Sequence, residues 1–251
     1  MGKTDWEGNS MQRLTHLIRY LQHRDDVTDE EIRALHSLPW RIKTWRASET
    51  FIRQGDVQTD SCLLLEGFAA RSHVLEDGAR QYSAVHIAGD FVDLHAFTLK
   101  IMDHDVVALR ECTVAYVPHQ SLKTLSETFP HLSRLLWLST TIDAAIQRAW
   151  IVSMGRRSAK DQMAHLICEL YVRLKSVGLV EGYSFEVPVT QADLADILGL
   201  SHVHANRTLQ SLRKEGSVLW QNRTVSIRDW NYLCSFAQFD PTYLNLMKMS
   251  R

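Results

Sequence analysis

One segment restricts the possible folds of this chain more than any other, "LADILGLSHVHANRTLQSLRKEG", at residues 194–216. It contains two short helical patterns separated by Gly199-Leu200-Ser201. The predicted buried stripes have helical spacing: Leu194, Ile197 and Leu198 in the first helix, and Ala205, Leu209 and Leu212 in the second. Gly199 allows a sharp turn between them, and the small Ala195 allows another helix to approach closely. The pattern therefore predicts a helix-turn-helix.

Both helices carry start signals. Thr190 is followed three residues later by Asp193, which is a capping-box spacing, and Ser201 is a good N-cap for the second helix. The second helix, at residues 201–215, is thereby predicted to present one polar, basic face to solvent.

That outward face combines base-reading and phosphate-binding chemistry. Arg207 can donate a pair of hydrogen bonds to guanine, Asn206 can pair with adenine, and Val203 can contact a thymine methyl group. Ser201, His202 and Gln210 are better placed for backbone phosphates. The residues predicted to contact DNA are Ser201, His202, Val203, Asn206, Arg207, Gln210, Arg213 and Arg223, with Lys214 on the same face.

The segment that follows, "SVLWQNRTVSIRD", is typical of a β-hairpin that turns at Gln221-Asn222-Arg223. Its Arg223 could reach a phosphate, as a wing beside the second helix. A solvated helical hairpin would explain the charges, but not the small-residue turn, the two caps and the hairpin together.

The distribution of charge favours the same region. The net charge of the chain is −1, yet residues 156–251 carry 12 Lys and Arg against 9 Asp and Glu, whereas residues 1–155 carry 16 against 20. Positive charge is therefore concentrated in the part of the chain that contains the predicted DNA-reading helix.

The rest of the chain divides into helical and β-rich parts. Residues 11–37 are predicted to be helical, with a capping box at Thr28 and Glu31. From Trp40 to Pro118, short β-rich pieces alternate with turns at Gly55-Asp56, Asp77-Gly78 and Gly89-Asp90, which suggests a small barrel or sandwich. Residues 178–188 are predicted to be a turn-rich connector that has room for one short strand.

Beyond Pro118 the helical period returns and forms a seam of heptad spacing. The seam residues, which are also the predicted dimer interface, are Leu135, Leu138, Ile142, Ala145, Ala149 and Val152. An ordinary core helix is the alternative explanation. Gly155 suits the end of this helix and Ser158 the cap of the next, so the domain boundary is predicted there.

Composition limits the class of protein. The chain has 251 residues, 45% of them hydrophobic and 23% charged, which is enough for a sizeable core. No apolar stretch is long enough to span a bilayer, and the start "MGKTDWEGNS" lacks the apolar core of a signal peptide. We therefore expect a cytoplasmic protein without a membrane partner. The four cysteines lie far apart, which argues against a local zinc or iron–sulfur site.

With these features in place, almost the whole chain resembles the Crp/Fnr family of bacterial transcription regulators. "VTQADLADILGLSHVHANRTLQSLRKEG" resembles the helix-turn-helix of the family, and "FIRQGDVQTDSCLLLEGFAARSHVLEDGARQYSAVHIAGDFVD" resembles its cyclic-nucleotide-binding-type β-roll. The resemblance implies an α+β fold: a β-roll sensor domain with a helical start at residues 1–118, a dimerisation helix at 119–155 and a winged helix-turn-helix at 156–251.

The resemblance also places the base-contacting positions of the family on His202, Val203, Asn206 and Arg207. Arg207 matches the recurring arginine, whereas Val203 replaces an acidic residue that is common there. We therefore expect a preferred half-site that differs from the usual one.

The effector is where the chain departs from the family. Cyclic-nucleotide binders place a Gly-Glu pair and later an arginine around the cyclic phosphate, whereas the corresponding stretch here offers Asp93, Asp103 and Asp105 and no arginine before Arg110. Carboxylates aimed at a phosphodiester would repel it, which argues against cyclic AMP. The chain also has no cysteine before Cys62, so it lacks the N-terminal cysteine cluster of the oxygen sensors of the family. No cofactor is predicted.

A metal or haem site is the alternative explanation for the histidines and aspartates of the β-rich part. The candidate ligands are His86, His95, His104, His119, Asp93, Asp103 and Asp105. Their spacing fits no compact ligand motif, so surface or hydrogen-bonded histidines are favoured and no metal ligand is assigned.

Three functions remain to be compared. The first is a homodimeric regulator that binds a palindromic operator in double-stranded DNA, and contacts RNA polymerase if it is an activator. The second is a metal- or haem-dependent sensor or hydrolase, although no hydrolase, P-loop or dinucleotide fingerprint occurs. The third is a ligand-binding scaffold that no longer reads DNA. The sequence favours the regulator and predicts no enzyme; it assigns no role to residues 236–251, which are expected to be helical after Pro241.

Overall fold

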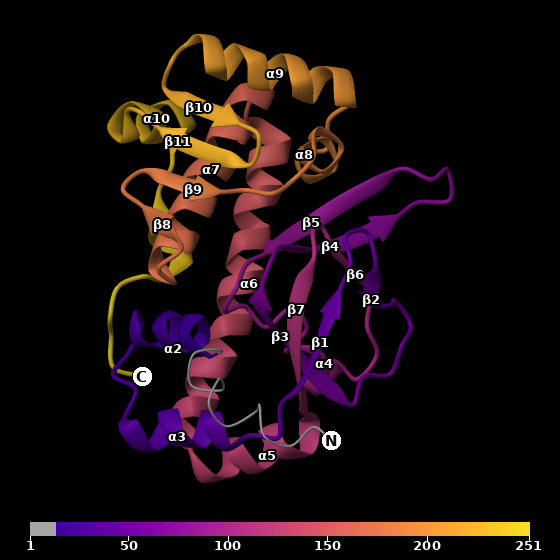
Figure 1. The fold of residues 1–251 in the computed structure, drawn as a ribbon, viewed down its shortest axis with the longest axis vertical. Coiled ribbons are helices and arrows are strands. Elements are labelled where there is room, and N and C mark those ends of the chain that lie inside the picture. Colours follow the sequence, from indigo (N-terminus) through magenta and orange to yellow (C-terminus); the bar gives the residue numbers. More distant parts are fainter. Residues whose placement is uncertain (1–13) are drawn as a thin grey trace. The chain divides into compact units, whose positions relative to one another are not determined.

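Residues 14–251 are described from a computed structural model, and the chain forms two compact units (Figure 1). Unit 1 is drawn from Met1–Ala69, His86–Thr141 and Leu246–Arg251, and unit 2 from Ala70–Val85 and Ile142–Asn245. The first residues of the helical pattern predicted at 11–37, and the start of the chain examined for a signal peptide, lie outside the described residues. Among the residues described, no helix is both long and apolar enough to cross a membrane.

The strands of unit 1 confirm the prediction that residues 40–118 are rich in short β-strands. β1 (Arg41–Trp45), β7 (Cys112–Pro118) and β3 (Asp60–Glu66) form an antiparallel sheet in the order β1-β7-β3. β2 (Thr50–Ile52) pairs antiparallel with β6 (Asp105–Ala108), and the register shifts between Thr50 and Ile52. The three predicted turn glycines, Gly55, Gly78 and Gly89, all adopt a positive φ outside the strands.

Two further strands form a hairpin that belongs almost wholly to unit 2. β4 (Ala69–Val74) is followed by a tight turn and by β5 (Arg80–His86). At the turn, the backbone N–H of Leu75 donates to the carbonyl of Ala79 at 2.8 Å, and Gly78 takes a φ of 84°. Glycine is favoured there because its backbone lacks the Cβ atom that makes positive φ costly.

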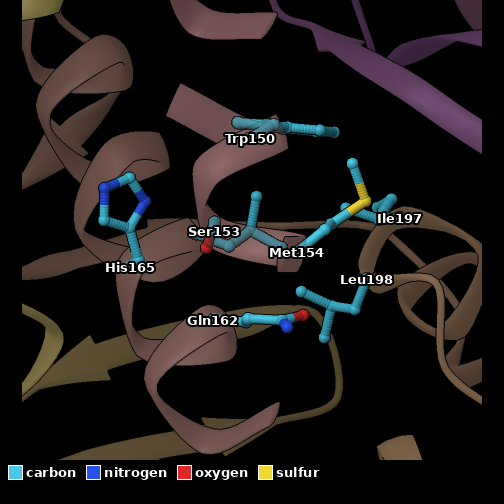
Figure 2. Close-up of a pocket in the computed structure, with 8 residues that line it drawn as sticks. Trp150, Ser153, Met154, Gln162, His165, Ile197 and Leu198 are labelled. Atoms are coloured by element: carbon cyan, nitrogen blue, oxygen red, sulfur yellow. The ribbon is translucent and has the colours of Figure 1, made fainter. Parts of the chain in front are cut away.

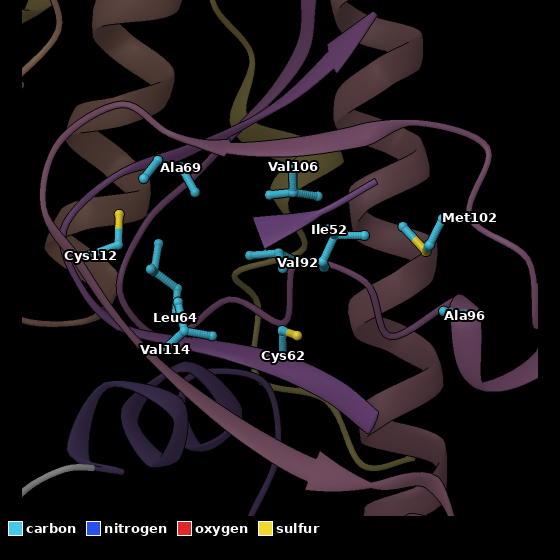
Figure 3. Packing of buried hydrophobic residues seen from close by; sticks show 11 residues of the cluster. Ile52, Cys62, Leu64, Ala69, Val92, Ala96, Met102, Val106, Cys112 and Val114 are labelled. Carbon is cyan, nitrogen blue, oxygen red and sulfur yellow. The ribbon is translucent and has the colours of Figure 1, made fainter. Parts of the chain in front are cut away.

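The core of unit 1 is apolar and lies between the strands (Figure 3). The buried side chains of this core are Ile52, Cys62, Leu64, Ala69, Val92, Ala96, Met102, Val106, Ala108, Cys112 and Val114. Burial raises the pKa of the Cys112 thiol to about 11, so this cysteine is a small apolar core residue at neutral pH.

Three longer helices accompany these strands in unit 1: α2 (Thr15–Gln22), α3 (Asp29–Ser37) and α5 (His119–Thr128). The capping box predicted at α3 is confirmed, because Thr28 and Glu31 exchange side-chain and backbone hydrogen bonds. A fourth helix, α4 (Ala96–Leu99), is a single turn that the sequence analysis did not predict. Four residues are too few to show a hydrophobic period.

The single helix predicted at residues 119–155 is instead two helices, α5 and α6 (Pro130–Arg156), because Pro130 disfavours a helical conformation at the preceding Phe129. α6 has 27 residues and belongs to unit 1 up to Thr141 and to unit 2 from Ile142. Its His131 lies between two carboxylates, with Nδ1 2.6 Å from Glu31 Oε1 and Nε2 3.1 Å from Asp25 Oδ2. Burial alone would lower the pKa of His131, but these two carboxylates raise it above its ordinary value.

α7 (Ala159–Ser176) follows α6 directly. Ser158 caps it as predicted, in a capping box with Asp161. The end predicted at Gly155 is nearly correct, since α6 continues only to Arg156.

Unit 2 also contains a four-stranded antiparallel sheet in the order β10-β11-β9-β8 (Figure 1). Its strands are β8 (Val180–Glu181), β9 (Ser184–Glu186), β10 (Val218–Gln221) and β11 (Thr224–Ile227). The connector expected at residues 178–188 thus holds two short strands. α10 (Trp230–Ala237) packs against α7.

A buried carboxylate ties three elements of unit 2 together. Glu169 of α7 is fully buried and accepts hydrogen bonds from Trp150 Nε1 at 3.0 Å and from Tyr243 OH at 2.7 Å. Arg173 Nη1 lies 3.3 Å from the same carboxylate. Burial raises the pKa of Glu169, while Arg173 and the hydrogen bonds oppose that shift. A buried charge is tolerated only when it is paired in this way.

The last part of the chain departs from the expected helix. After Pro241 the structure has only one short 3₁₀ turn, η1 (Pro241–Leu244), which ends at Asn245 in the left-handed region with a φ of 51°. The chain then returns to unit 1, where the backbone N–H of Met249 donates to the carbonyl of Arg24 at 3.0 Å. The backbone N–H of Arg251 donates to Asp25 Oδ2 at 2.7 Å.

Candidate nucleic-acid interface

The two helices predicted around Gly199 are present as α8 (Gln191–Leu198) and α9 (His202–Lys214). Thr190 Oγ1 accepts from the N–H of Asp193 at 3.0 Å, and Asp193 Oδ2 accepts from the N–H of Thr190 at 2.8 Å. Gly199 ends α8 in the left-handed region with a φ of 64°. Ser201 then caps α9 by accepting from the N–H of His204 at 3.3 Å. Both predicted caps and the predicted turn are therefore confirmed.

The inward faces of these helices are as expected. The buried residues of the pair include all the predicted ones: Leu194, Ala195, Ile197 and Leu198 in α8, and Ala205, Leu209 and Leu212 in α9. Ala195 is fully buried, which fits its proposed role at a close approach between helices. α9 packs against both α7 and α8, so its orientation is fixed by contacts on two sides.

The opposite side of α9 is open to solvent. We call this set the recognition face, and its exposed members are Ser201, His202, Val203, Asn206, Arg207 and Gln210. Val203 has 78% of its surface exposed, the highest fraction among the large hydrophobic residues that the structure describes. An isolated valine gains nothing from water, so its position beside Asn206 and Arg207 fits a surface that is covered when a partner binds.

Arg213 differs from the other predicted contacts. It is half-buried, and its guanidinium donates to the carbonyl oxygen of Trp220 in β10. Nearby, Lys160 of α7 forms an ion pair with Glu215 at the end of α9. These contacts position α9 against its neighbours. Arg213 therefore helps to orient the recognition face, and fewer of its N–H donors are available to a ligand than those of Arg207.

The predicted wing is formed by β10 and β11. Gln221 pairs with Thr224, which leaves a two-residue turn of Asn222 and Arg223. Asn222 adopts a φ of 55°, a conformation that asparagine tolerates better than most residues. Arg223 is exposed at the tip, and its carbonyl accepts from the N–H of Val187 at 2.7 Å, which anchors the turn on the neighbouring segment.

A small cavity lies where α6, α7 and α8 meet (Figure 2). Its lining includes Trp150, Met154, His165 and Leu198, and its volume is about 20 Å³. Burial lowers the pKa of His165 to about 4, so this ring is neutral and belongs to the packing. The cavity is too small for an effector molecule.

The residues of the predicted dimer seam have unequal exposure. Leu135 and Ile142 are 1% and 5% exposed, so they offer almost no surface to a partner. Leu138, Ala145 and Ala149 are half-buried, and Val152 is 55% exposed. The large exposed apolar side chains on α6 outside this seam are Trp137, Ile151 and Met154. A heptad pattern alone does not show which side of a helix its own domain covers.

The candidate metal ligands are mostly dispersed. Asp93 is fully buried and accepts from the N–H of Cys62 at 2.6 Å. His119 Nε2 lies 3.1 Å from Ser61 Oγ, and Asp105 accepts from the N–H of Gln54 at 2.7 Å. The three that come together are His95, Asp103 and His104. Asp103 and His104 follow His95 by eight and nine positions. The fold of the segment between them was not predicted from the sequence.

A larger cavity of about 330 Å³ occurs in unit 1 between α4, α5 and α6. Its walls are mainly apolar and include Leu94, Leu122, Leu136 and Trp137, with His95 at one side. Its volume falls in the range of small-molecule sites.

The comparisons with known proteins agree with this geometry. A family model described as a Crp-like helix-turn-helix domain matches residues 161–236, and one described as a cyclic nucleotide-binding domain matches residues 42–129. The transcriptional activator protein FnrL of Cereibacter sphaeroides is 24% identical over 215 residues, which cover 84% of this chain and 86% of that protein. The transcriptional activator protein anr of Pseudomonas aeruginosa is 21% identical over 211 residues, with 84% and 86% covered.

Solved structures show the same fold. The structure of FixK2 from Bradyrhizobium japonicum has a TM-score of 0.72 at 22% identity and covers 79% of this chain and 98% of its own. A CooA mutant from Carboxydothermus hydrogenoformans has a TM-score of 0.63 at 16% identity, with 86% and 99% covered.

A cyclic-nucleotide-binding-type β domain, a long helix and a C-terminal winged helix-turn-helix define a class of two-part DNA-binding regulators. The chain belongs to the Crp/Fnr family of transcription regulators, as its sequence resemblance implied. The relatives reported above are bacterial regulators and not enzymes, and the chain is accordingly a regulator with a helix-turn-helix DNA-binding domain.

Proposed function

We propose that this regulator is a homodimer that binds a palindromic operator through the recognition face of α9. The observation that carries the proposal is the exposure of Val203, Asn206 and Arg207 on one side of a helix whose other side is firmly packed. Side chains of these three types can distinguish base pairs in the major groove. The wing residue Arg223 adds a cation that can contact the phosphate backbone.

Selection of bound sequences from a pool of random DNA duplexes tests the proposal, with untagged protein at a fixed salt concentration. A two-fold symmetric dimer should enrich a palindrome whose half-sites are centred about 34 Å apart, or one turn of DNA. Salt must be held constant because contacts to phosphate make the affinity depend on it. A pool that stays random at every salt concentration tried, with and without cell extract as a source of effector, would contradict the proposal.

Two variants sharpen this experiment. Arg207→Ala should weaken binding to the selected sequence by about 1–3 kcal/mol and relax the preference at one position in each half-site. Lys214→Ala removes an exposed cation from the same helix and should weaken binding to all sequences alike. Equal behaviour of the two variants would mean that Arg207 reads no base.

The dimer would form through the outer side of α6. The exposed or half-buried residues there repeat at heptad spacing one position before the predicted seam: Trp137, Thr141, Ala144, Arg148 and Ile151. Leu138, Ala145 and Val152 of the predicted seam flank this stripe and would contribute to it. The proposed contact stripe lies one residue before the predicted seam because Leu135 and Ile142 are buried within the chain's own fold. The opposite side of the helix would then face the partner.

The effector of the sensor part would be a molecule other than cyclic AMP. Arg71, the buried arginine of β4, has its Nη2 2.8 Å from Asp143 Oδ2, so its charge is already balanced by a carboxylate. The stretch after Gly89 adds the carboxylates of Asp103 and Asp105, which disfavour a phosphodiester, whereas Asp93 is fully buried. Isothermal titration with cyclic AMP should therefore show no binding at micromolar concentrations. If the regulator activates transcription, RNA polymerase would be a further partner.

A further inference from the structure

The β domain brings two imidazoles and one carboxylate together at a single place. His95 comes directly before α4, whereas Asp103 and His104 come directly before β6. One potential ligand atom from each residue lies within 4.8 Å of the other two. These residues come from two turns of the chain, so their meeting depends on the fold of this part of unit 1.

The segment that carries Asp103 and His104 is held in place by backbone hydrogen bonds. The N–H of Met102 donates to the carbonyl of Asp56 at 3.0 Å, and the N–H of Gly55 donates to the carbonyl of Met102 at 2.8 Å. On the other side, the N–H of Lys100 donates to the carbonyl of Ala96 at 3.0 Å, which closes the turn of α4. The three side chains are therefore presented by an ordered backbone.

The distances are close to those of a metal site. His104 Nδ1 lies 2.7 Å and His95 Nε2 lies 4.0 Å from the same oxygen, Asp103 Oδ1. The two imidazole rings are 5.2 Å apart between centroids. A metal ion about 2.0–2.2 Å from each ligand atom keeps these atoms about 3 Å from one another. Shifts of about 1 Å, within reach of side-chain rotation, would bring the three atoms to that spacing.

The types of the three side chains and their exposure also fit a metal site. His104 is 2% exposed and His95 23% exposed, whereas Asp103 is 70% exposed. The site thus has a protected imidazole side and an open carboxylate side through which an ion could enter. Two imidazoles and a carboxylate suit zinc, iron(II) and similar ions, and such a set leaves coordination positions for water or a small ligand.

We propose that His95, Asp103 and His104 bind one divalent transition-metal ion. The hydrogen-bonded His104–Asp103 pair involves two of these residues, whereas a metal ion would use all three. His95 also lines the 330 Å³ cavity of unit 1, so an ion held by these residues would lie next to a space of small-molecule size. The proposal does not depend on DNA binding, because the ion would be bound by unit 1 alone.

Titration of the untagged full-length protein with Zn²⁺, after treatment with a chelator and its removal, tests the proposal by calorimetry. We expect one high-affinity equivalent per chain. His95→Gln and Asp103→Asn should each weaken that binding by more than about tenfold, since each removes one of three ligands. Both residues are partly exposed, so these variants should fold even if His104→Gln, which changes a buried side chain, does not.

Two matched controls separate the site from general binding by histidine or charge. His73→Gln changes a histidine of β4 and Asp56→Asn changes an exposed carboxylate, and neither residue belongs to the cluster. Both variants should bind Zn²⁺ with the same affinity as the parent protein. Co²⁺ should in addition give visible d–d absorption that is lost in His95→Gln. The proposal is overturned if the parent protein binds no Zn²⁺ at micromolar concentrations, or if His95→Gln and Asp103→Asn bind it as tightly as the controls do.

Discussion

At the scale of single residues, the recognition face is where the sequence was most informative. The exposure of Val203, Asn206 and Arg207 followed from helical spacing, because apolar residues three and four positions apart fix the buried side. The half-buried state of Arg213 did not follow, since its partner is a backbone carbonyl of β10 seven residues away. Sequence spacing does not reveal such side-chain-to-backbone contacts.

Val203 should determine one base of the half-site. Replacing it with glutamate (Val203→Glu) introduces an acceptor for the cytosine amino group and removes the methyl contact, so the selected half-site should change at one position toward cytosine. Sequencing of the pool bound by each protein measures this. Val203→Ala, which shortens the side chain without adding an acceptor, should instead broaden the preference at that position. An identical consensus for parent and glutamate variant would show that residue 203 faces no base.

Asp93 should make the stability of the protein depend on pH. Burial raises the pKa of this carboxyl from 3.8 to about 7, against the hydrogen bonds from Cys62 that lower it. Between these pH values the folded protein holds a proton that the unfolded chain releases, so the free energy of unfolding falls as the pH rises through this window. Above about pH 7 the contribution of Asp93 to the free energy of unfolding no longer changes with pH.

The comparison with Asp93→Asn isolates this effect. Each pH unit within the window corresponds to about 1.4 kcal/mol. The free energy of unfolding of the parent should therefore fall by roughly 2–3 kcal/mol, relative to that of the variant, between about pH 5 and about pH 8. Urea denaturation at the two pH values measures the difference, and titration of other groups cancels between the two proteins. Parallel pH profiles would mean that Asp93 keeps an ordinary pKa.

Gly67 should tolerate no side chain. It has a φ of +91°, and a Cβ atom there would lie 2.4 Å from the carbonyl oxygen of Glu111, a backbone atom that cannot move aside. Gly55 is the matched control, because its φ is +87° but a Cβ atom there meets nothing within 4 Å. Gly55→Ala should cost about 1–2 kcal/mol from backbone strain, and Gly67→Ala clearly more. Chemical denaturation of both variants checks the order.

At the scale of elements, the order of helical and β-rich segments was predictable, whereas several short elements and the break between α5 and α6 were not. Caps at Thr28, Ser158, Thr190 and Ser201 follow from local chemistry and are all present. α4 and the 3₁₀ turn after Pro241 have four residues each, which is too few to produce a period. The meeting of His95 with Asp103 and His104 depends on one of these turns and was therefore not visible.

Strand β5 and helix α8 are joined by an ion pair between Arg80 and Asp196. Nε and Nη2 of Arg80 both lie 2.6 Å from Asp196 Oδ2, and Gln81 Nε2 donates to the carbonyl of Ile197 at 3.3 Å. Because Arg80 is 40% exposed, we expect the pair to stabilise α8 by only about 0.5–1 kcal/mol. Arg80→Ala should accordingly speed hydrogen exchange of the α8 amides about two- to fivefold.

Mass spectrometry of deuterium uptake measures this change in α8. Lys123→Ala, which breaks an exposed pair with Glu127 at 3.9 Å, is the control and should leave α8 unchanged. Higher salt should reduce the difference between the parent and Arg80→Ala, because screening weakens exposed ion pairs. Unchanged exchange in Arg80→Ala at low salt would show that the pair does not hold the helix.

At the scale of the whole molecule, the proposed dimer predicts a specific assembly defect. Ile151 is 66% exposed on the outer side of α6, and a charge there would be buried against the partner. Ile151→Glu should convert the dimer to a monomer at micromolar concentration, as measured by sedimentation equilibrium. Lys123→Glu introduces the same carboxylate at an exposed position of α5 and should leave the assembly intact. A parent protein that sediments as a monomer would contradict the dimer itself.

The two units are interleaved along the chain, and this has a consequence for synthesis. Residues 248–251 bond to residues 24–26: Lys248 pairs with Asp26, and Arg251 donates to Asp25 across a separation of 226 positions. During synthesis, residues 24–26 therefore lack these particular partners until residues 248–251 have been translated. Contacts so distant in sequence form late in folding. A nascent chain stalled before residue 246 should accordingly be more sensitive to protease around residues 24–26 than the released protein is.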